Sequence, residues 1–482
     1  MADVLIIGGG PAGVTAALRA RELGASVTLL ESRRLGGTCT NGGCVPVRAL
    51  AKAARLVRDA GHAARYGVVV SRPTVDFAAV MAKTQAVVEQ VQRKKHLADH
   101  LRSCGVDVHD NTGDATFVDP HTLKVHDGRR FSGKTILLAV GGHPAKLPVP
   151  GGELAIGPEP AFWRMRTLPR RTIVVGASAT GCQIATAFAA FGSHVTVIEQ
   201  APVILSTADN VVSSTIERAY ADQGITVIAD CAKGVTGIDR NADGSLCVTY
   251  DLGDGEPRTV EADLVFSAVG WPGNADRLNL AAAGLEPGKR GYLSVDEYQR
   301  TAVPHIFAAG DLDGQLLLVQ TAYAEGALAA ENMVRGPQRK STRHAVPYGG
   351  FTDPEYGGVG LTEANARKQG HDVATAVVRY DQLDRAVIDG LTIGCCKLIV
   401  DRVTHKILGA HVVGEDAAEV VQVIAAFIAT DATLDPLIHL QLSYPTYTAI
   451  VGLAARQLAR ELGIVDQQTM LSVPADWERG GG

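Results

Sequence analysis

The sequence lacks any apolar run approaching the roughly 20 residues that a membrane-spanning helix needs. A buried-strand pattern begins within three residues of Met1, so we expect no secretory signal peptide and a cytoplasmic location. The net charge is only −5, without a basic stripe for nucleic acid or an extended disordered composition. We therefore expect neither a nucleic acid nor a membrane as a partner.

Cysteine is also scarce, with 8 residues among 482, which does not suit the disulfide framework of a small secreted domain. In a reducing compartment, a close pair is more often redox-active or metal-binding. Cys39 and Cys44, separated by four residues in GGTCTNGGCVP, form such a pair. The isolated cysteines are expected to be packing residues: Cys104, Cys182, Cys231 and Cys247. The length itself suits about three domains of ~150 residues.

A dinucleotide-binding fingerprint precedes the cysteine pair. An apolar strand at 4–7 leads into Gly8, Gly10 and Gly13, and a helical pattern follows. Gly8 permits the tight turn, Gly10 lets the backbone approach a pyrophosphate, and Gly13 lets helix and strand pack closely. A second strand then delivers Glu31, placed to accept hydrogen bonds from an adenosine ribose. The pattern predicts a nucleotide site.

The same layout recurs near residue 171. A strand at 172–175 leads into Gly176, Ser178 and Gly181, and a later strand ends at Glu199. Two nucleotide sites are therefore expected. Ser178 replaces the middle glycine and crowds the pyrophosphate slightly. Glu199 would repel a 2′-phosphate and no arginine follows it directly, which favours NADH, with NADPH remaining possible.

Three further strand ends suit a protein with two nucleotide sites. The apolar stretch 301–309 leads to Gly310 and Asp311, and such an aspartate can bond a flavin ribityl hydroxyl. The alternative is a plain strand followed by a turn. Gly141 and Gly270 close two more apolar strands and suit crossings between the nucleotide domains.

These motifs resemble, over nearly the whole chain, the flavoprotein pyridine nucleotide-disulfide oxidoreductases, which include dihydrolipoamide dehydrogenase, glutathione reductase and mercuric reductase. The stretches FTDPE at 351–355 and VGLTE at 359–363 look like the start of the family's C-terminal dimerisation domain. The resemblance implies FAD and NAD(P)H as cofactors and a homodimer. It implies an α/β fold with two Rossmann-like dinucleotide-binding domains and a C-terminal α+β dimerisation domain.

The implied domain boundaries follow the motifs. Residues 1–150 form the FAD-binding domain with the cysteine pair, 151–270 the NAD(P)H-binding domain, 271–340 a return to the flavin region, and 345–482 the dimerisation domain. Within the first domain, long helical stretches are expected at 48–61 and 76–103.

By resemblance, electrons pass from the nicotinamide through the flavin to the disulfide between Cys39 and Cys44. Cys44 is the flavin-proximal, charge-transfer thiol, and Cys39 is the interchange thiol that faces the acceptor. A structural disulfide is the alternative. It is disfavoured because such a bridge gains stability mainly by closing a longer loop, whereas the helix expected from residue 45 suits a thiolate of lowered pKa.

The chain departs from the family pattern at the position of its proton-transfer dyad. Ordinary disulfide reductases carry a histidine before a proline and an acid five residues later, supplied by the other subunit. Here these positions hold Tyr444 and Ala449. A phenol of pKa ~10 protonates a departing thiolate poorly. We expect an acceptor that needs no such base, either a metal ion, a quinone-like molecule or an unusual disulfide. A thiol-disulfide reductase with an altered base, and a flavin-bearing redox sensor or binding protein, remain alternatives.

Mercuric reductase also lacks the dyad, yet it commonly ends in a vicinal cysteine pair, and residues 475–482 contain none. Cys395 and Cys396 form such a pair elsewhere. They could relay a metal, but adjacent strand residues face opposite sides, so packing is favoured.

The flavin edge shows a further departure. Arg48 stands where the family has lysine, and Gln183 replaces that lysine's glutamate partner. Either Arg48 makes the field at the flavin more positive, or it reaches solvent.

Overall fold

A computed structural model describes residues 1–71, 73–342 and 345–464. The described chain divides into two compact units. The first contains residues 1–206 and 220–342, and the second contains 207–219 and 345–464. Each is built around its own sheets, and they are described separately.

The first sheet of the first unit is arranged around β1 (Ala2–Ile7), whose last four residues are all buried. Strand order is β3-β2-β1-β6-β5-β4, and β14 also pairs with β6. The bounds are β2 (Val27–Leu30), β3 (Asp107–His109), β4 (Thr116–Asp119), β5 (Thr122–Lys124), β6 (Arg130–Leu138) and β14 (Ile306–Ala308). Strands β1, β2, β3, β6 and β14 pair in parallel. Parallel pairing therefore brings residues 306–308 beside β6.

The second nucleotide fingerprint lies in a parallel sheet of order β13-β7-β8-β9. An antiparallel sheet, β10-β11-β12, follows it in the same unit. The bounds are β7 (Arg171–Val175), β8 (His194–Ile198), β9 (Thr226–Ile228), β10 (Gly234–Arg240), β11 (Leu246–Asp251), β12 (Arg258–Ala262) and β13 (Leu264–Ser267). Helix α7 (Ala179–Phe191) connects β7 to β8, and α8 (Asn210–Asp222) connects β8 to β9.

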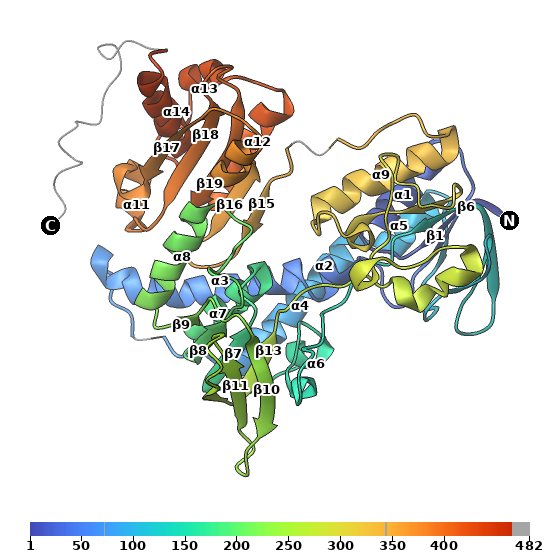
Figure 1. The fold of residues 1–482 in the computed structure, drawn as a ribbon, viewed down its shortest axis with the longest axis horizontal. Helices are drawn as coiled ribbons and strands as arrows, with labels where there is room; N and C mark the ends of the chain where they lie inside the picture. Colours follow the sequence, from blue (N-terminus) through green and yellow to red (C-terminus); the bar gives the residue numbers. More distant parts are fainter. Residues whose placement is uncertain (72, 343–344, 465–482) are drawn as a thin grey trace. The chain divides into compact units, whose positions relative to one another are not determined.

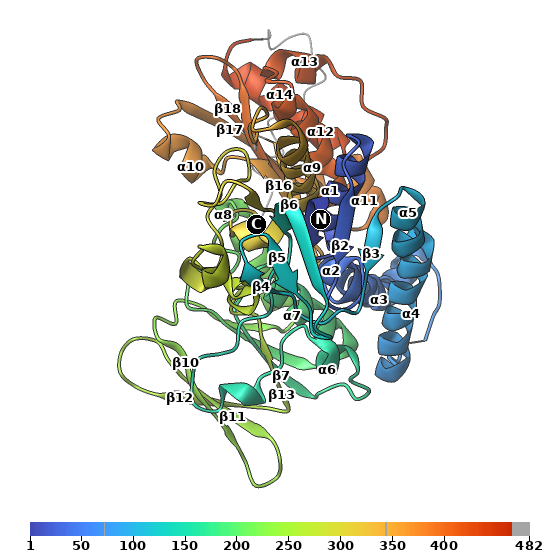
Figure 2. The same cartoon turned by 90° about the vertical axis from the view of Figure 1, so that its right-hand side faces the viewer.

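Helices of the first unit bring the motifs together. Helices α1 (Pro11–Glu22) and α9 (Val319–Arg335) lie side by side, although residues 23–318 separate them in the sequence (Figures 1 and 2). Helix α3 packs against α4 and α7. The remaining bounds are α2 (Gly37–Asn41), α3 (Cys44–His62), α4 (Phe77–Lys95), α5 (Leu97–Ser103) and α6 (Pro160–Trp163).

The helical stretch predicted at 76–103 is present, but it is divided into two helices. His96 lies between α4 and α5 with a φ of 44°. This left-handed conformation ends α4 at Lys95. The helix expected from residue 45 and the helical stretch expected at 48–61 are one helix, α3, from Cys44 to His62.

The second unit is an α+β arrangement, whose residues 345–464 are shown in orange and red in Figure 1. Its antiparallel sheet has the order β15-β16-β19-β18-β17. Helix α12 packs against β16 and β19, and α14 packs against β17 and β18. The bounds are β15 (Tyr348–Gly350), β16 (Tyr356–Gly360), β17 (Val373–Arg379), β18 (Cys395–Asp401), β19 (Ile407–Val413), α10 (Glu363–Lys368), α11 (Asp384–Asp389), α12 (Ala417–Ala429), α13 (Leu434–His439) and α14 (Ala449–Glu461).

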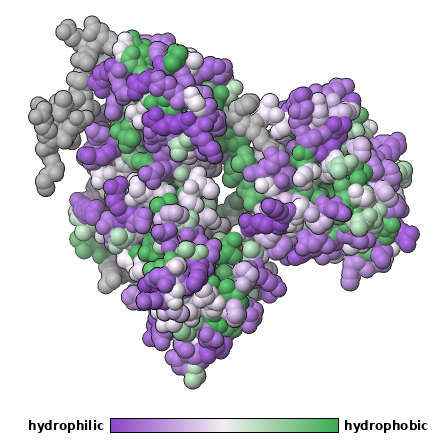
Figure 3. Space-filling model, viewed as in Figure 1, coloured by the Kyte–Doolittle hydropathy of each residue, from purple (hydrophilic) through white to green (hydrophobic). Residues whose placement is uncertain are grey.

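The predicted fold class is confirmed. Two parallel sheets each carry a glycine loop followed by a helix, and an α+β unit follows them. In the part of the chain that is described, no helix is both long and apolar enough to cross a bilayer. On the face shown in Figure 3, hydrophilic residues predominate and hydrophobic ones are scattered among them.

Candidate active site

The first glycine loop has the backbone geometry that its sequence predicts. Gly8 has a φ of 106°, a conformation that glycine adopts readily and other residues rarely adopt. A side chain at Gly13 would collide with the carbonyl of Gly8, so the close packing of strand and helix requires glycine there. A Cβ at Gly10 would meet nothing nearer than the Cα of Gly37, at 3.8 Å. The N-terminus of α1 therefore presents an open backbone to an anion.

An acidic side chain is fixed beside each of the two glycine loops in the same way. Glu31 Oε2 accepts a hydrogen bond from the Gly9 amide at 2.7 Å, and its Oε1 accepts one from the Arg33 amide at 2.8 Å. In the second fingerprint, Glu199 accepts from the amides of Ala177 and Ala201, at 2.5 and 2.8 Å. The structure thus places both predicted ribose-reading acids at matching positions.

The second loop has the same glycine geometry as the first. Gly176 has a φ of 95°, and a side chain at Gly181 would collide with the Gly176 carbonyl. Ser178 is the extended N-cap residue of α7. The two strand-end glycines are tied across the loops that follow: the Gly141 carbonyl accepts from the Asn274 amide, and the Gly270 carbonyl from the Ala145 amide, both at 3.0 Å.

Two buried polar groups just after β14 and at the start of α9 fit the ribityl chain of FAD. Burial, assisted by Asp313, raises the pKa of Asp311 to about 6. Because burial disfavours its charge, this carboxylate would gain from a ribityl hydroxyl donor. Thr321 Oγ1, at the start of α9, is buried without a hydrogen-bond partner among the described residues. Gly310 lies against α1 and α9, since a Cβ there would contact Ala12 and Ala322.

The cysteine pair lies where α2 meets α3. Cys39 belongs to α2 and is half-buried, and Cys44 is the first residue of α3 and is exposed. The hydrogen bond from the Cys39 thiol, together with a backbone amide at the helix start, lowers the pKa of Cys44 to about 7. The same contact and burial raise the pKa of Cys39. Such a pair carries its thiolate on Cys44 near neutral pH.

Charged groups from other elements face this pair. The Lys95 ammonium lowers the pKa of each thiol, whereas the Asp311 carboxylate raises it. The two sulfurs in turn raise the pKa of Tyr323, on α9, beyond the effect of its own burial. Sequence reasoning missed Lys95 and Tyr323, because neither lies in a recognisable motif.

Arg48 and Gln183 lie on helices that pack together, α3 and α7. Gln183 Nε2 donates to the Ala179 carbonyl of its own helix at 2.7 Å. Arg48 is half-buried rather than fully exposed. Its action on the flavin stays a prediction.

Tyr444 is placed by a contact that the sequence did not reveal. Its side chain is 75% exposed, and its hydroxyl donates to Asp384 Oδ2 at 2.8 Å. This contact raises the pKa of Tyr444, so the phenol holds its proton at neutral pH. Ala449 begins α14 and offers no carboxylate. The pair formed here, tyrosine with aspartate, is a poorer proton donor than an imidazole.

The other cysteines differ from one another in exposure. Cys395 and Cys396 are both buried in β18, as expected of packing residues. Burial raises the pKa of Cys395 to about 11 and that of Cys396 still further. Cys182 and Cys231 are buried as predicted, and Cys247 is half-buried.

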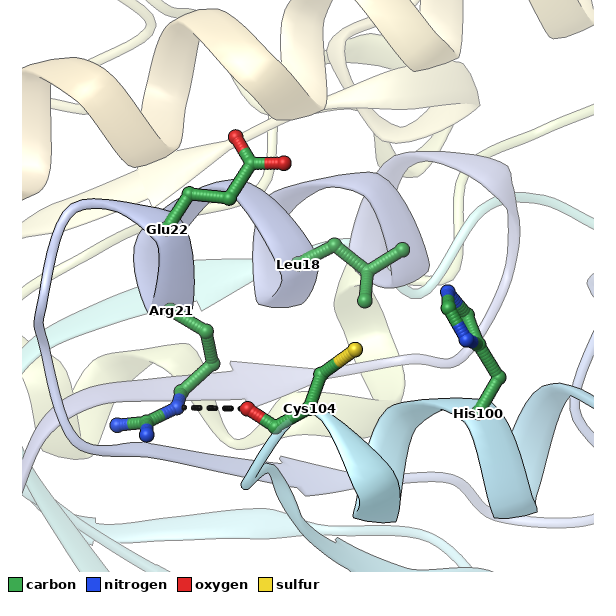
Figure 4. A pocket seen from close by; sticks show the side chains of 5 residues that line it. All are labelled: Leu18, Arg21, Glu22, His100 and Cys104. Carbon is green, nitrogen blue, oxygen red and sulfur yellow. Dashed lines mark hydrogen bonds between the residues drawn. The ribbon is translucent and has the colours of Figure 1, made fainter.

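The prediction for Cys104 is wrong, because this residue is exposed. It lines a surface depression between α1 and α5, where its carbonyl accepts from Arg21 Nε at 3.1 Å (Figure 4). The other lining residues are Leu18, Glu22 and His100. None of the predicted redox residues lines this depression. Among the described residues, no group of three or more metal-ligating side chains is present. Residues 475–482, where a terminal cysteine pair is missing from the sequence, lie outside the described residues.

Comparison with known proteins confirms the resemblance. The family model described as pyridine nucleotide-disulphide oxidoreductase matches residues 2–326, and that family's dimerisation domain matches residues 346–455. A mercuric reductase of Lysinibacillus sphaericus is 31% identical over 95% of this chain and 83% of its own length. A dihydrolipoyl dehydrogenase of Geobacillus stearothermophilus is 32% identical over 94% of this chain and 95% of its own.

Solved structures show the same relationship. The HOCl-induced flavoprotein disulfide reductase RclA from Escherichia coli superposes with a TM-score of 0.83 at 26% identity, over 94% of this chain and 99% of that one. Its Cu(II) complex superposes equally well, at 25% identity over 95% and 99% of the two chains.

Proposed function

The chain belongs to the pyridine nucleotide-disulphide oxidoreductase family of flavin-dependent enzymes, and we propose that it reduces an acceptor that needs no histidine–glutamate base. The observation that carries this proposal is the Tyr444–Asp384 contact, which stands in place of the family's proton-transfer dyad. We further propose that it is a cytoplasmic homodimer, supported by the match to the dimerisation domain.

In this proposal, FAD, when bound, transfers the two electrons of NAD(P)H to the disulfide. The chain's own residues hold the cofactors in place and set the protonation of the two thiols. The loop at Gly8, Gly10 and Gly13 and the acid Glu31 hold the dinucleotide, and Asp311 holds the ribityl chain. Gly176, Ser178, Gly181 and Glu199 receive the nicotinamide nucleotide. Gly141, Gly270 and Gly310 let the backbone turn between these loops.

The two thiols have separate tasks. Cys44 carries the thiolate because its pKa lies near 7, and Cys39 keeps its proton and faces the acceptor. Closing the S–S bond from the Cys44 thiolate and the Cys39 thiol releases two electrons to the acceptor and one proton to solvent. A metal ion or a quinone accepts these electrons without the protonation of a departing thiolate, so loss of the dyad does not impede it.

Relatives support a metal ion as the acceptor. Similar proteins are named mercuric reductase, and the matching RclA structure is also known as a Cu(II) complex. The second candidate is a thiol-disulfide reductase with an altered base. The similarity to dihydrolipoyl dehydrogenases supports this candidate, because these enzymes are as similar to this chain as the mercuric reductases and match over 95% of their own length.

A steady-state acceptor screen decides between these candidates. The holoenzyme is supplied with NADH or NADPH and with lipoamide, glutathione disulfide, Hg(II), Cu(II), a quinone or oxygen. We expect Hg(II), Cu(II) or the quinone to be reduced fastest, and Cys39→Ser to abolish that activity. Turnover of lipoamide or glutathione disulfide at hundreds per second would instead establish the disulfide reductase. Failure of every acceptor would favour a redox sensor.

A further inference from the structure

One face of α4 lies along residues 34–41, the segment that leads into the cysteine pair and contains Cys39. Three of its residues, spaced three apart, contact this segment. Arg34 forms a bidentate ion pair with Glu89, with distances of 2.6 and 2.8 Å. Gln92 and Lys95 contact the segment one and two turns later. A spacing of three places these side chains on one side of the helix.

Gln92 fixes this segment in place near its start, at Leu35, and at Asn41. It is buried, and its Nε2 donates to the Leu35 carbonyl at 2.7 Å and to Asn41 Oδ1 at 2.6 Å. Asn41 in turn donates to the Gly37 carbonyl at 2.9 Å. Gly36 is tightly enclosed beneath this contact, since a Cβ there would lie 3.1 Å from Gln92 Nε2. Buried amide contacts of this kind restrict the loop to one conformation.

Lys95 reaches the loop between the two sulfurs. Its Nζ donates to Thr40 Oγ1 at 2.9 Å, and Thr40, which directly follows Cys39, is almost completely buried. Lys95 is the last residue of α4, where the helix dipole leaves partial negative charge. The ammonium offsets that charge. It also opposes the Asp311 carboxylate, which faces the same thiols from the end of β14.

We propose that Lys95 is a positioning residue for the Cys39–Cys44 pair, holding the intervening loop through Thr40 and supplying the positive charge beside the sulfurs. Lys95 can have this role only if the pair cycles between dithiol and disulfide, as proposed above. Its neighbour Lys94 lies on the same turn but is exposed, so it provides a matched control.

The test measures the alkylation of the reduced holoenzyme by iodoacetamide from pH 5 to 9, with the modified cysteine identified by peptide mass spectrometry. Lys95→Met removes the charge and keeps most of the stem, whereas Lys95→Arg keeps the charge. An increase of one unit in the pair's apparent pKa from about 7 lowers the thiolate fraction at pH 7 about fivefold. We expect that decrease in Lys95→Met, and rates within twofold of wild type in Lys95→Arg and Lys94→Met.

Thr40→Val is a second variant in case Lys95→Met does not accumulate with FAD bound. It removes the hydroxyl that anchors the ammonium, and we expect a smaller decrease in the same direction. A pH profile in Lys95→Met that matches Lys94→Met would overturn the proposed role. Mass spectrometry of the wild type separates the two proposals, because a pair that never forms a disulfide refutes the redox function itself.

Discussion

At the scale of single residues, the two thiols of the pair differ in pKa because they lie at different positions in their helices. Cys44 opens a helix, so its sulfur lies at backbone amides that favour a negative charge, and it accepts a hydrogen bond from Cys39. Cys39 donates that bond and is partly buried, so its proton is retained. One electron pair is thus available on a defined sulfur at neutral pH.

The acidity of Cys44 predicts a pH-dependent spectrum. Above a pH of about 7 the thiolate is present, and below it the sulfur is protonated. The long-wavelength thiolate–flavin absorption of the two-electron-reduced holoenzyme should therefore fall as pH is lowered through about 7. Cys44→Ser should lack the band while FAD stays bound. Cys39→Ser cannot form the disulfide, so it should show the band before reduction, while its flavin is still oxidised. An anaerobic absorbance titration checks this, and a band that survives in Cys44→Ser would remove Cys44 from its assigned role.

Glu199 predicts the nucleotide preference. Its carboxylate is fixed by two backbone amides at the end of β8, so it cannot turn away from a 2′-phosphate. NADH should give the higher kcat/KM. Glu199→Gln removes the charge but keeps a side chain of the same shape, and it should raise kcat/KM for NADPH roughly tenfold, about 1.4 kcal/mol of transition-state stabilisation. The prediction is wrong if wild-type enzyme prefers NADPH, or if the variant's preference is unchanged.

At the scale of elements, local patterns predicted the strands and turns but not the contacts between distant segments. The glycine loops were predictable because Gly8 and Gly176 need positive φ values and each follows an apolar strand. The contacts of Lys95 with Thr40 and of Tyr444 with Asp384 join residues 55 and 60 positions apart. Tertiary packing forms them, and no motif marks them. The break between α4 and α5 was missed because it depends on the left-handed conformation of His96, and a histidine in the sequence does not predict that conformation.

A buried ion cluster on β18 is a second long-range feature that the sequence did not reveal. The Lys397 side chain is 9% exposed, and its Nζ lies 2.9 Å from Asp209 Oδ1 and 2.7 Å from Glu363 Oε2. Lys397→Met would leave a buried carboxylate beside another acid, so we expect a loss of about 3–5 kcal/mol in unfolding free energy. Lys406→Met is the matched control, because its pair with Asp431 is exposed and should contribute under ~1 kcal/mol. Equal unfolding midpoints for the two variants in chemical denaturation would contradict this account.

At the scale of the whole molecule, the proposed function depends on a second copy of the chain. In the family the acceptor site is shared between subunits, and the dimerisation-domain match covers the segment with Tyr444 and Ala449. A dyad restored by Tyr444→His and Ala449→Glu should therefore serve the dithiol of the partner, not its own. Because general acid–base groups contribute about 10²- to 10⁴-fold, the restored homodimer should gain lipoamide or glutathione disulfide turnover of that order. Activity with metal ions or quinones should change far less.

Mixed dimers make this prediction specific to the subunit arrangement. Two differently tagged chains are co-expressed and the heterodimer is purified through both tags. In the first heterodimer, one chain carries Tyr444→His, Ala449→Glu and Cys44→Ser, and the other chain is wild type. The restored dyad then meets an intact dithiol across the interface. In the second, Cys44→Ser is placed on the partner instead, so the dyad meets only the disabled pair. Disulfide turnover per intact cysteine pair should rise in the first heterodimer and stay at the wild-type level in the second. A gain in the second alone would show that the dyad serves its own chain, and a gain in neither would show that another group limits proton transfer to the departing thiolate.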